Sequence, residues 1–308
     1  MFRVGVDIGG TNIAVGLVHD SLQIVRKYSV PFPKTGVSDV VGDVSGAIRE
    51  LLAQENVSPD QLSSLGVVVP GSISPGGTHV IHAYNLDFHN VPLQALLRQR
   101  FPDLPVLIAN DADGAALAEL YCGALRGFRS GILLTLGTGL GGGMILNGQL
   151  YNGGLHQGCE LGHMLLADGG KPCTCGNRGC AEAYCSASAL AEAGKEAALS
   201  HPESALASLS FIDAKAVVDC AKAGDETALA VFDRYLDSLS SFCASLFNLL
   251  DAEVLAIGGG LSGAGDFLFS RLEKKTDPKC FYSRHGAIVP AQLGNDAGIL
   301  GAALLGLS

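Results

Sequence analysis

The sequence predicts an α/β protein with a duplicated fold, in which two domains face each other across a cleft. A unit of strand, glycine hairpin and strand lies near the start of the chain and recurs near its middle. The length of 308 residues exceeds what one compact core usually occupies. Apolar residues make up 48% of the chain and charged residues 16%, with 41 glycines, which is typical of a tightly packed α/β protein.

The first half opens with the hairpin. Val4–Asp7 and Ile13–Val18 predict two strands, because short apolar runs bounded by glycine and polar turn residues are typical of strands. The turn between them contains Gly9 and Gly10. The other elements expected in this half are an amphipathic helix at 40–52, strands at 65–69 and 106–109, and a helix from 111 to 121.

The second half repeats this start. Ile132–Leu136 predicts a strand, 137–143 a glycine turn, and Met144–Leu146 a returning strand. The elements expected after it are helices at 188–195, 214–223 and 227–250, a strand at 254–257, and a helix at 297–305. We expect the last helix to pack on the first half. That arrangement predicts a small domain of 1–112 plus 296–308 and a large domain of 113–295.

Composition excludes several classes of function. The net charge of −10 argues against nucleic acid, because binding to a phosphate backbone requires clustered Lys and Arg. An acidic residue, Asp7, follows too few apolar residues for a signal peptide, and other apolar runs end well before the ~20 residues that a membrane span needs. We therefore expect a cytoplasmic protein that binds small molecules, with no nucleic-acid or membrane partner.

Three glycine turns at strand ends predict a site for nucleotide phosphates, because a backbone without Cβ can approach an anion closely. Any one of these turns alone is equally consistent with a tight hairpin. A nicotinamide site is excluded, because the G-x-G-x-x-G pattern at 137–142 precedes a strand instead of a helix. Phosphate binding of the P-loop kind is excluded because no Walker A lysine is present. The glycines of these turns are Gly9, Gly10, Gly137, Gly139, Gly258, Gly259 and Gly260.

Asp111 lies where a predicted strand ends and a helix begins, so the helix dipole favours its charge and it is a candidate general base. The alternative is a helix N-cap, since Asp is a preferred capping residue. The same two roles, general base and helix N-cap, are open for Asp7 and Asp113.

A histidine and three cysteines predict a zinc site: His163, Cys173, Cys175 and Cys180 lie within 18 residues of chain. Four protein ligands leave no position for a metal-bound water, so this zinc should be structural. Free buried cysteines are the alternative. Glu160 and Glu182 flank the zinc loop, and two fixed carboxylates suit a ligand with several hydroxyls, whereas solvated surface acids are their commoner fate.

These motifs resemble those of the ROK family of sugar kinases and repressors. The resemblance covers essentially the whole chain and rests on the three glycine turns, on Glu160-Leu161-Gly162-His163, and on the segment from Cys173 to Glu182. Asp113 departs from it, since asparagine is usual after the base. The resemblance implies a duplicated actin-like/ribonuclease-H-like two-domain sugar kinase fold, with ATP, Mg²⁺ and structural Zn²⁺.

The resemblance also implies residue roles. Asp111 corresponds to the catalytic base. The resemblance adds Asp7, Thr11 and Thr138 to the glycines of the three turns as nucleotide-binding residues. The positions that match sugar ligands are Gly71, Asn85, Asn110, Asp111, Glu160, His163 and Glu182. We expect an ATP-dependent hexose kinase that phosphorylates glucose at O6 and forms a homodimer or homotetramer.

Other hexose substrates and other classes of protein function are alternatives. Fructose, mannose, allose, N-acetylglucosamine and N-acetylmannosamine are alternative substrates. A non-catalytic sugar sensor is a further alternative, although it would have no need for Asp111. A repressor of the same family would carry a DNA-binding region ahead of the first hairpin, and Asp7 is only seven residues into the chain.

Overall fold

The structure, a computed structural model, describes residues 1–155 and 158–307. The chain forms two compact units. The first unit comprises Met1–Gly127, Gly143–Cys159 and Leu293–Ser308, and the second comprises Phe128–Gly142 and Glu160–Gln292. The division expected from sequence, 1–112 plus 296–308 and 113–295, has different boundaries from these two units and stays a prediction.

The first unit is built on a five-stranded sheet of order β3-β2-β1-β4-β8. Its strands are β1 (Phe2–Ile8), β2 (Asn12–His19), β3 (Ile24–Pro31), β4 (Leu62–Val69) and β8 (Val106–Asn110). The first three form an antiparallel meander, whereas β4 runs parallel to both β1 and β8. The carboxyl ends of β1, β4 and β8 therefore meet at one edge of the sheet.

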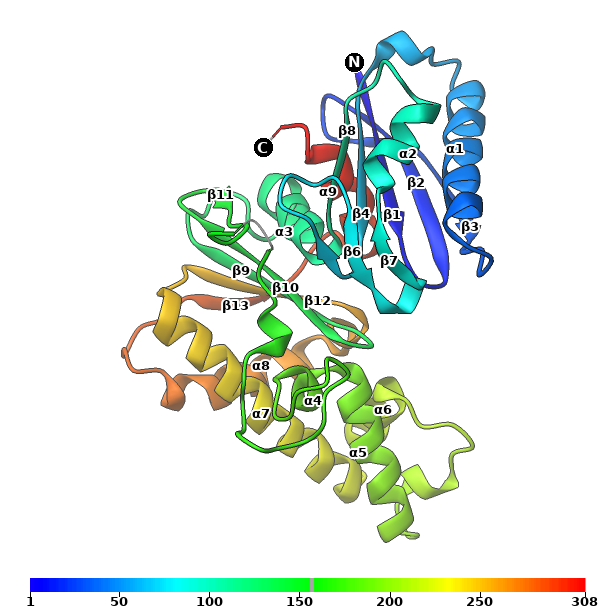
Figure 1. The fold of residues 1–308 in the computed structure, drawn as a ribbon. Coiled ribbons are helices and arrows are strands. Elements are labelled where there is room, and N and C mark those ends of the chain that lie inside the picture. The colour runs from blue at the N-terminus through cyan, green and yellow to red at the C-terminus, as the bar shows by residue number, and fades with distance from the viewer. Residues whose placement is uncertain (156–157, 308) are drawn as a thin grey trace. The chain divides into compact units, whose positions relative to one another are not determined.

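Helices cover both faces of this sheet (Figure 1). They are α1 (Val37–Gln54) and α2 (Leu93–Arg100) on one face, and α3 (Asp111–Cys122) and α9 (Ala297–Leu304) on the other. The expected packing of the last helix on the first half is confirmed. Close packing of α9 depends on glycines in the strands, because a Cβ at Gly5 would lie 2.0 Å from the carbonyl oxygen of Ile299 and one at Gly66 1.7 Å from that of Ala302.

A three-stranded antiparallel sheet of order β5-β6-β7 completes the first unit. Its strands are β5 (Ser72–Ile73), β6 (Val80–Ala83) and β7 (Phe88–Val91), and a short 3-10 helix, η2 (Tyr84–Leu86), joins the last two. None of these strands was expected from sequence, because each is too short to show a period.

The second sheet has the order β11-β10-β9-β12-β13. Its strands are β9 (Gly131–Leu136), β10 (Leu140–Leu146), β11 (Gln149–Leu150), β12 (Val254–Gly258) and β13 (Ala287–Pro290). Strand β12 runs parallel to β9 and to β13, as β4 runs parallel to β1 and to β8. The two sheets thus share one order of elements, as the repeated hairpin predicts. The predicted glycine turn at 137–143 was too long, because β10 already begins at Leu140.

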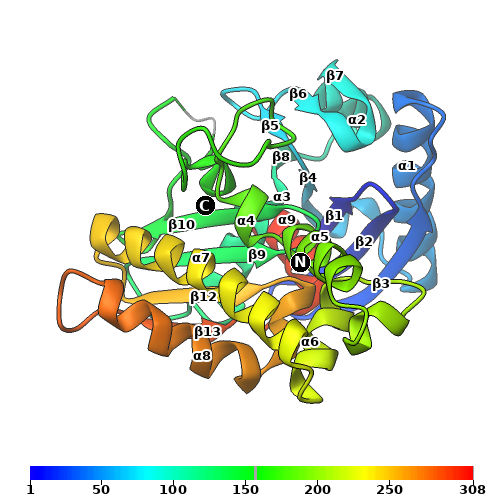
Figure 2. The ribbon, with the colours of Figure 1, turned by 90° about the horizontal axis from the view of Figure 1, so that it is seen from below.

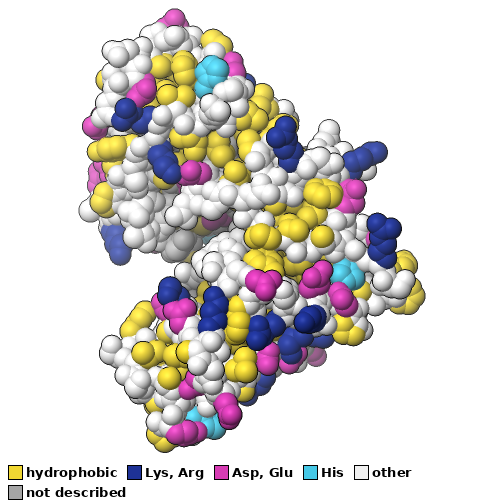
Figure 3. Space-filling view, turned by 180° about the vertical axis from the view of Figure 1, so that it is seen from behind, with side chains coloured by type: hydrophobic (Ala, Val, Ile, Leu, Met, Phe, Trp, Pro, Cys, Tyr) yellow, Lys and Arg dark blue, Asp and Glu magenta, His cyan; other side chains and the backbone are white. Residues whose placement is uncertain are grey.

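Helices accompany the second sheet, and Figure 2 shows α7 and α8 running alongside its strands. The helices of the second unit are α4 (Glu182–Cys185), α5 (Ala187–Ser200), α6 (Ala214–Lys222), α7 (Glu226–Leu250) and α8 (Asp266–Thr276). Within the residues that the structure describes, no helix is both long and apolar enough to cross a membrane. On the face drawn in Figure 3, basic and acidic side chains are interspersed.

Candidate active site

Two carboxylates, Asp7 and Asp111, lie at the carboxyl ends of β1 and β8, the two strands that flank β4 in the first unit. Asp7 pairs with Val68 of β4, and the next residue of β4 pairs with Asn110 at the end of β8. Burial, and secondarily the Asp111 carboxylate, raises the pKa of Asp7 from 3.8 to about 6. Burial also raises the pKa of Asp111, although the backbone N–H of Ala112 donates to its Oδ1 at 2.9 Å and opposes that shift. A carboxylate with a raised pKa is a better proton acceptor near neutral pH.

The N-cap of α3 is Asn110 and not Asp111, so the capping alternative for Asp111 is wrong. The Oδ1 of Asn110 accepts hydrogen bonds from the backbone N–H of Ala112 at 2.8 Å and of Asp113 at 3.3 Å. The Asn110 Nδ2 donates to the carbonyl oxygen of Gly71 at 2.9 Å. With the cap supplied by its neighbour, Asp111 is the first residue of the helix and its carboxylate is available for other chemistry.

Gly71 and Asn85, two of the predicted sugar-site positions, lie in the same unit as Asp111. Gly71 has a positive φ of 95°, and a Cβ there would lie 2.0 Å from the carbonyl oxygen of His82, so only glycine fits this turn. Asn85 is exposed on η2. A Cβ at Gly10, in the first glycine turn, would be 3.5 Å from the Asn85 Nδ2. The first unit thus brings the first glycine turn next to a predicted sugar ligand.

The second and third glycine turns lie at one cavity of about 480 Å³ in the second unit. Gly137 and Thr138 line it from the second turn and Gly260 from the third. A Cβ at Gly137 or Gly260 would meet no atom within 4 Å, whereas Gly259 is required by its φ of 81° and by the carbonyl oxygen of Leu136. The volume and the open glycine backbone fit a nucleotide, whose phosphates bind exposed N–H groups.

Glu182, the first residue of α4, joins the predicted zinc loop to the second glycine turn. Its Oε2 accepts a hydrogen bond from the backbone N–H of Leu140 at 3.0 Å, and its Oε1 accepts one from the hydroxyl of Thr174 at 3.0 Å. The carboxylate is half-buried and fixed at both oxygens. Glu182 is therefore not a free surface acid.

Glu160 and His163 bracket a short 3-10 helix, η3 (Leu161–His163), in the same unit. The Glu160 side chain is exposed, and the backbone N–H of His163 donates to its carbonyl oxygen at 3.1 Å. Gly162 packs against the second glycine turn, because a Cβ there would lie 2.0 Å from the Leu140 carbonyl oxygen. This contact requires glycine in the Glu160–His163 motif.

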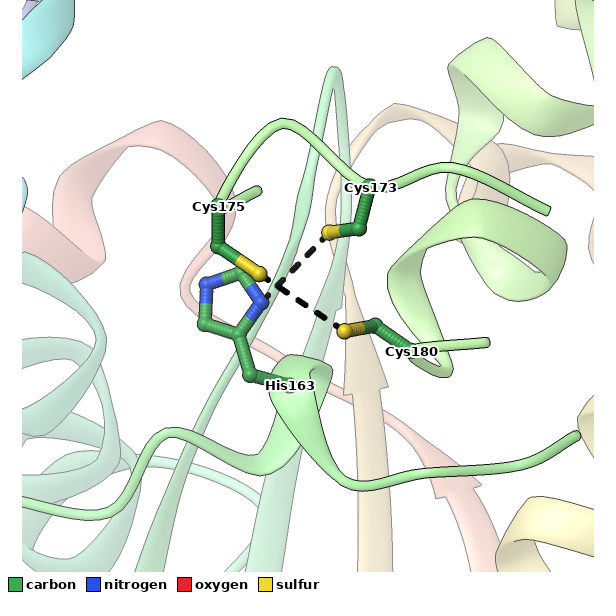
Figure 4. A group of neighbouring side chains, drawn as sticks. All are labelled: His163, Cys173, Cys175 and Cys180. Carbon is green, nitrogen blue, oxygen red and sulfur yellow. Dashed lines mark hydrogen bonds between the residues drawn. The ribbon is translucent and has the colours of Figure 1, made fainter. Parts of the chain in front are cut away.

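His163, Cys173, Cys175 and Cys180 form one cluster (Figure 4), with their ligand atoms all within 4.8 Å of one another. The Cys175 and Cys180 sulfurs are 3.7 Å apart, and the Cys173 sulfur is 3.7 Å from the His163 Nδ1. Tetrahedral zinc with Zn–S bonds of about 2.3 Å places its sulfur ligands about 3.8 Å apart. Three sulfurs and one imidazole at these separations fit a four-coordinate zinc.

The sequence model of the ROK family matches residues 3–308. The chain belongs to the ROK family. This ROK protein is 37% identical to a glucokinase of Thermotoga maritima over 308 residues, covering 97% of the chain and 95% of the relative. It is 35% identical to a glucokinase of Halalkalibacterium halodurans, with 97% and 92% covered.

Two further comparisons describe the range of relatives. An N-acetylmannosamine kinase of Vibrio cholerae is 31% identical, with 98% of each chain covered. The crystal structure of a ROK family glucokinase from Streptomyces griseus, in complex with glucose and AMPPNP, is 33% identical with a TM-score of 0.85 and covers 99% of each chain. The predicted family and the actin-like sugar kinase fold are confirmed.

Sequence reasoning missed part of the nucleotide-sized cavity of this ROK protein. Its remaining wall comes from α5, from α6 with its N-cap Asp213, and from the segment after the third glycine turn. No motif marks these positions, which lie far apart in the sequence. Asp213 offers the one local signal, because its side chain caps α6 by accepting from the backbone N–H of Ala216 at 2.7 Å.

Proposed function

We propose that this ROK protein is an ATP-dependent hexose kinase that phosphorylates glucose at O6. The observation that carries the proposal is Asp111, a half-buried carboxylate of raised pKa at a strand-to-helix junction, relieved of capping by Asn110. Whole-length similarity to glucokinases supports it.

The family resemblance assigns sugar contacts to Gly71, Asn85 and Asn110, which lie in the first unit, and to Glu160, His163 and Glu182, which lie in the second. Acceptors such as carboxylates pair sugar hydroxyls, and burying them penalises sugars whose hydroxyls are misplaced. The Asn110 Oδ1 is occupied by the helix cap, so we expect the second N–H of its Nδ2, beside the one donated to Gly71, to contact the sugar.

Phosphoryl transfer depends mainly on positioning and on neutralising charge, because its loose transition state needs little covalent help. Asp111 would accept a hydrogen bond from the O6 hydroxyl and receive its proton as the bond from O6 to the γ-phosphorus forms. The bond from that phosphorus to the bridging oxygen breaks, and ADP leaves with the electron pair. The glycine turns would bind the triphosphate, and Asp7 would help to hold Mg²⁺, which would offset the charge of the phosphates when bound.

The His163 and cysteine cluster would bind a structural zinc. All four positions of a tetrahedral ion would be filled by protein, so the zinc supplies conformational stability to the loop between Glu160 and Glu182. His163 would then serve both as a zinc ligand through Nδ1 and, through its other ring edge, as a sugar contact.

A coupled assay for ADP release across glucose, fructose, mannose, allose, N-acetylglucosamine and N-acetylmannosamine tests the proposal. Chromatography of the product against hexose 6-phosphate standards then assigns the phosphorylated hydroxyl. Glucose 6-phosphate as the best product supports the proposal. Preferred turnover of N-acetylmannosamine would instead favour the activity of the Vibrio relative, and ADP release with no sugar dependence would contradict hexose phosphorylation.

A further inference from the structure

The backbone of Leu140, at the end of the second glycine turn, is held from two sides. Its N–H donates to the Glu182 Oε2 at 3.0 Å, and its carbonyl oxygen abuts Gly162. Gly139, the preceding residue, lies so close that a Cβ there would be 2.5 Å from the same Glu182 oxygen. The Glu182 carboxylate therefore fixes the position of this turn.

The other oxygen of Glu182 is fixed from the His163 and cysteine cluster. Thr174 lies between Cys173 and Cys175, and its hydroxyl donates to the Glu182 Oε1 at 3.0 Å. The Cys173 sulfur also donates to that oxygen, at 3.6 Å, but sulfur is a weak donor. The Thr174 hydroxyl is therefore the stronger of the two donors that fix the Glu182 Oε1.

We propose that Thr174 is a positioning residue, which acts through Glu182 to hold the second glycine turn in the conformation that binds phosphate. The inference rests on the proposed function, since it assigns phosphate binding to that turn. Two neighbouring metal ligands fix the backbone on both sides of Thr174, so its hydroxyl is presented at a defined place. The conformation of the cluster is thereby transmitted through a side-chain hydroxyl and a carboxylate to the Leu140 N–H.

This role is compatible with a sugar contact by Glu182. An ionised carboxylate has about four acceptor positions, and the hydrogen bonds from Thr174 and Leu140 use one on each oxygen. Acceptor capacity remains on both oxygens. Fixing the carboxylate from two sides also removes the conformational freedom that a sugar hydroxyl would otherwise have to restrict on binding.

Two variants of Thr174 test the proposal in the full chain. Thr174→Val keeps the shape and removes the hydroxyl, whereas Thr174→Ser keeps the hydroxyl and removes the methyl. The Thr174 side chain is exposed, so neither change disturbs the core, and both variants should retain the zinc content of the wild type. Exchange of the Leu140 amide with deuterium, resolved by residue in protein without ligands, reports the hydrogen bond to Glu182.

We expect the Leu140 amide to exchange about tenfold faster in Thr174→Val and within about twofold of wild type in Thr174→Ser. Unchanged exchange in Thr174→Val would overturn the proposal, and equally fast exchange in both variants would assign the effect to packing of the loop. Calorimetric titration with AMPPNP should show an affinity about fivefold to tenfold lower in Thr174→Val alone. Equal AMPPNP affinity in wild type and Thr174→Val would overturn the role in phosphate binding.

The two readouts separate this inference from the proposed function. If the wild type binds no AMPPNP and phosphorylates no hexose, the kinase proposal fails. The exchange measurement needs neither ligand, so it still decides whether Thr174 and Glu182 hold Leu140.

Discussion

Asp7 and Asp111 are electrostatically coupled: after burial, the Asp111 carboxylate is the second cause that raises the pKa of Asp7 to about 6. The unfolded-state value is 3.8, so the folded protein binds more protons than the unfolded chain between these two values. The stability that protonated Asp7 contributes is therefore fully present below pH 3.8 and is lost as the pH rises through about 6. Ionised Asp7 costs the fold on the order of 3 kcal/mol at neutral pH.

Asp7→Asn is expected to raise the melting temperature of the ligand-free protein at pH 7.5 and to change it little at pH 4.5. The amide cannot ionise, so the cost of the buried charge disappears only where wild-type Asp7 is charged. Thermal unfolding of both proteins at the two pH values measures this difference. If Asp7→Asn lowered the melting temperature equally at both pH values, the ionised Asp7 carboxylate would not destabilise the folded protein. We expect the same variant to lose kinase activity.

Asn110 is expected to contribute separately to stability and to the sugar site. Asn110→Ala removes the cap of α3 and should lower the free energy of unfolding by about 1 kcal/mol. Asn110→Ser restores a capping oxygen but cannot reach Gly71, so it should recover stability while the hexose KM stays raised in both variants. Urea unfolding and steady-state kinetics measure the two effects. Equal stability of the Ala and Ser variants would contradict the capping role.

The metal cluster is expected to hold about one zinc per chain in protein purified without chelator. Cys175→Ser should lower zinc content, melting temperature and activity together, because the loop that carries Glu182 loses its support. Cys220→Ser, which changes a half-buried cysteine outside the cluster, is the matched control and should keep its zinc. Elemental analysis of all three proteins decides the assignment, and wild type free of transition metal would refute it.

The duplicated hairpin and the metal cluster were predictable because each depends on residues close in sequence. Asp111 was identified from its place at a strand end, but its neighbour Asn110 takes the helix cap, and no local pattern distinguishes which of two adjacent capping residues does so. The hydrogen bond from Leu140 to Glu182 joins positions 42 residues apart in the sequence. Such contacts depend on tertiary packing, which periodicity and spacing do not report.

Glucose is expected to be preferred over N-acetylglucosamine and N-acetylmannosamine by at least about tenfold in kcat/KM, or about 1.4 kcal/mol of transition-state binding. An acetamido group replaces a small hydroxyl donor with a bulkier amide, whereas Glu160 and Glu182 offer acceptors suited to hydroxyls. Kinetics with the three sugars at saturating ATP measure the ratio. Equal or better turnover of either amino sugar would overturn the glucose assignment and leave the kinase proposal intact.

The most direct test of the central claim is the turnover of Asp111→Asn. Loss of a general base should lower kcat by about 10² to 10⁴, while calorimetry shows glucose binding within about tenfold of wild type. Asp113→Asn, in the same helical turn, removes a neighbouring carboxylate and should keep nearly full turnover. If Asp111→Asn retains more than about a tenth of wild-type kcat, Asp111 is not the base and the proposed mechanism is contradicted.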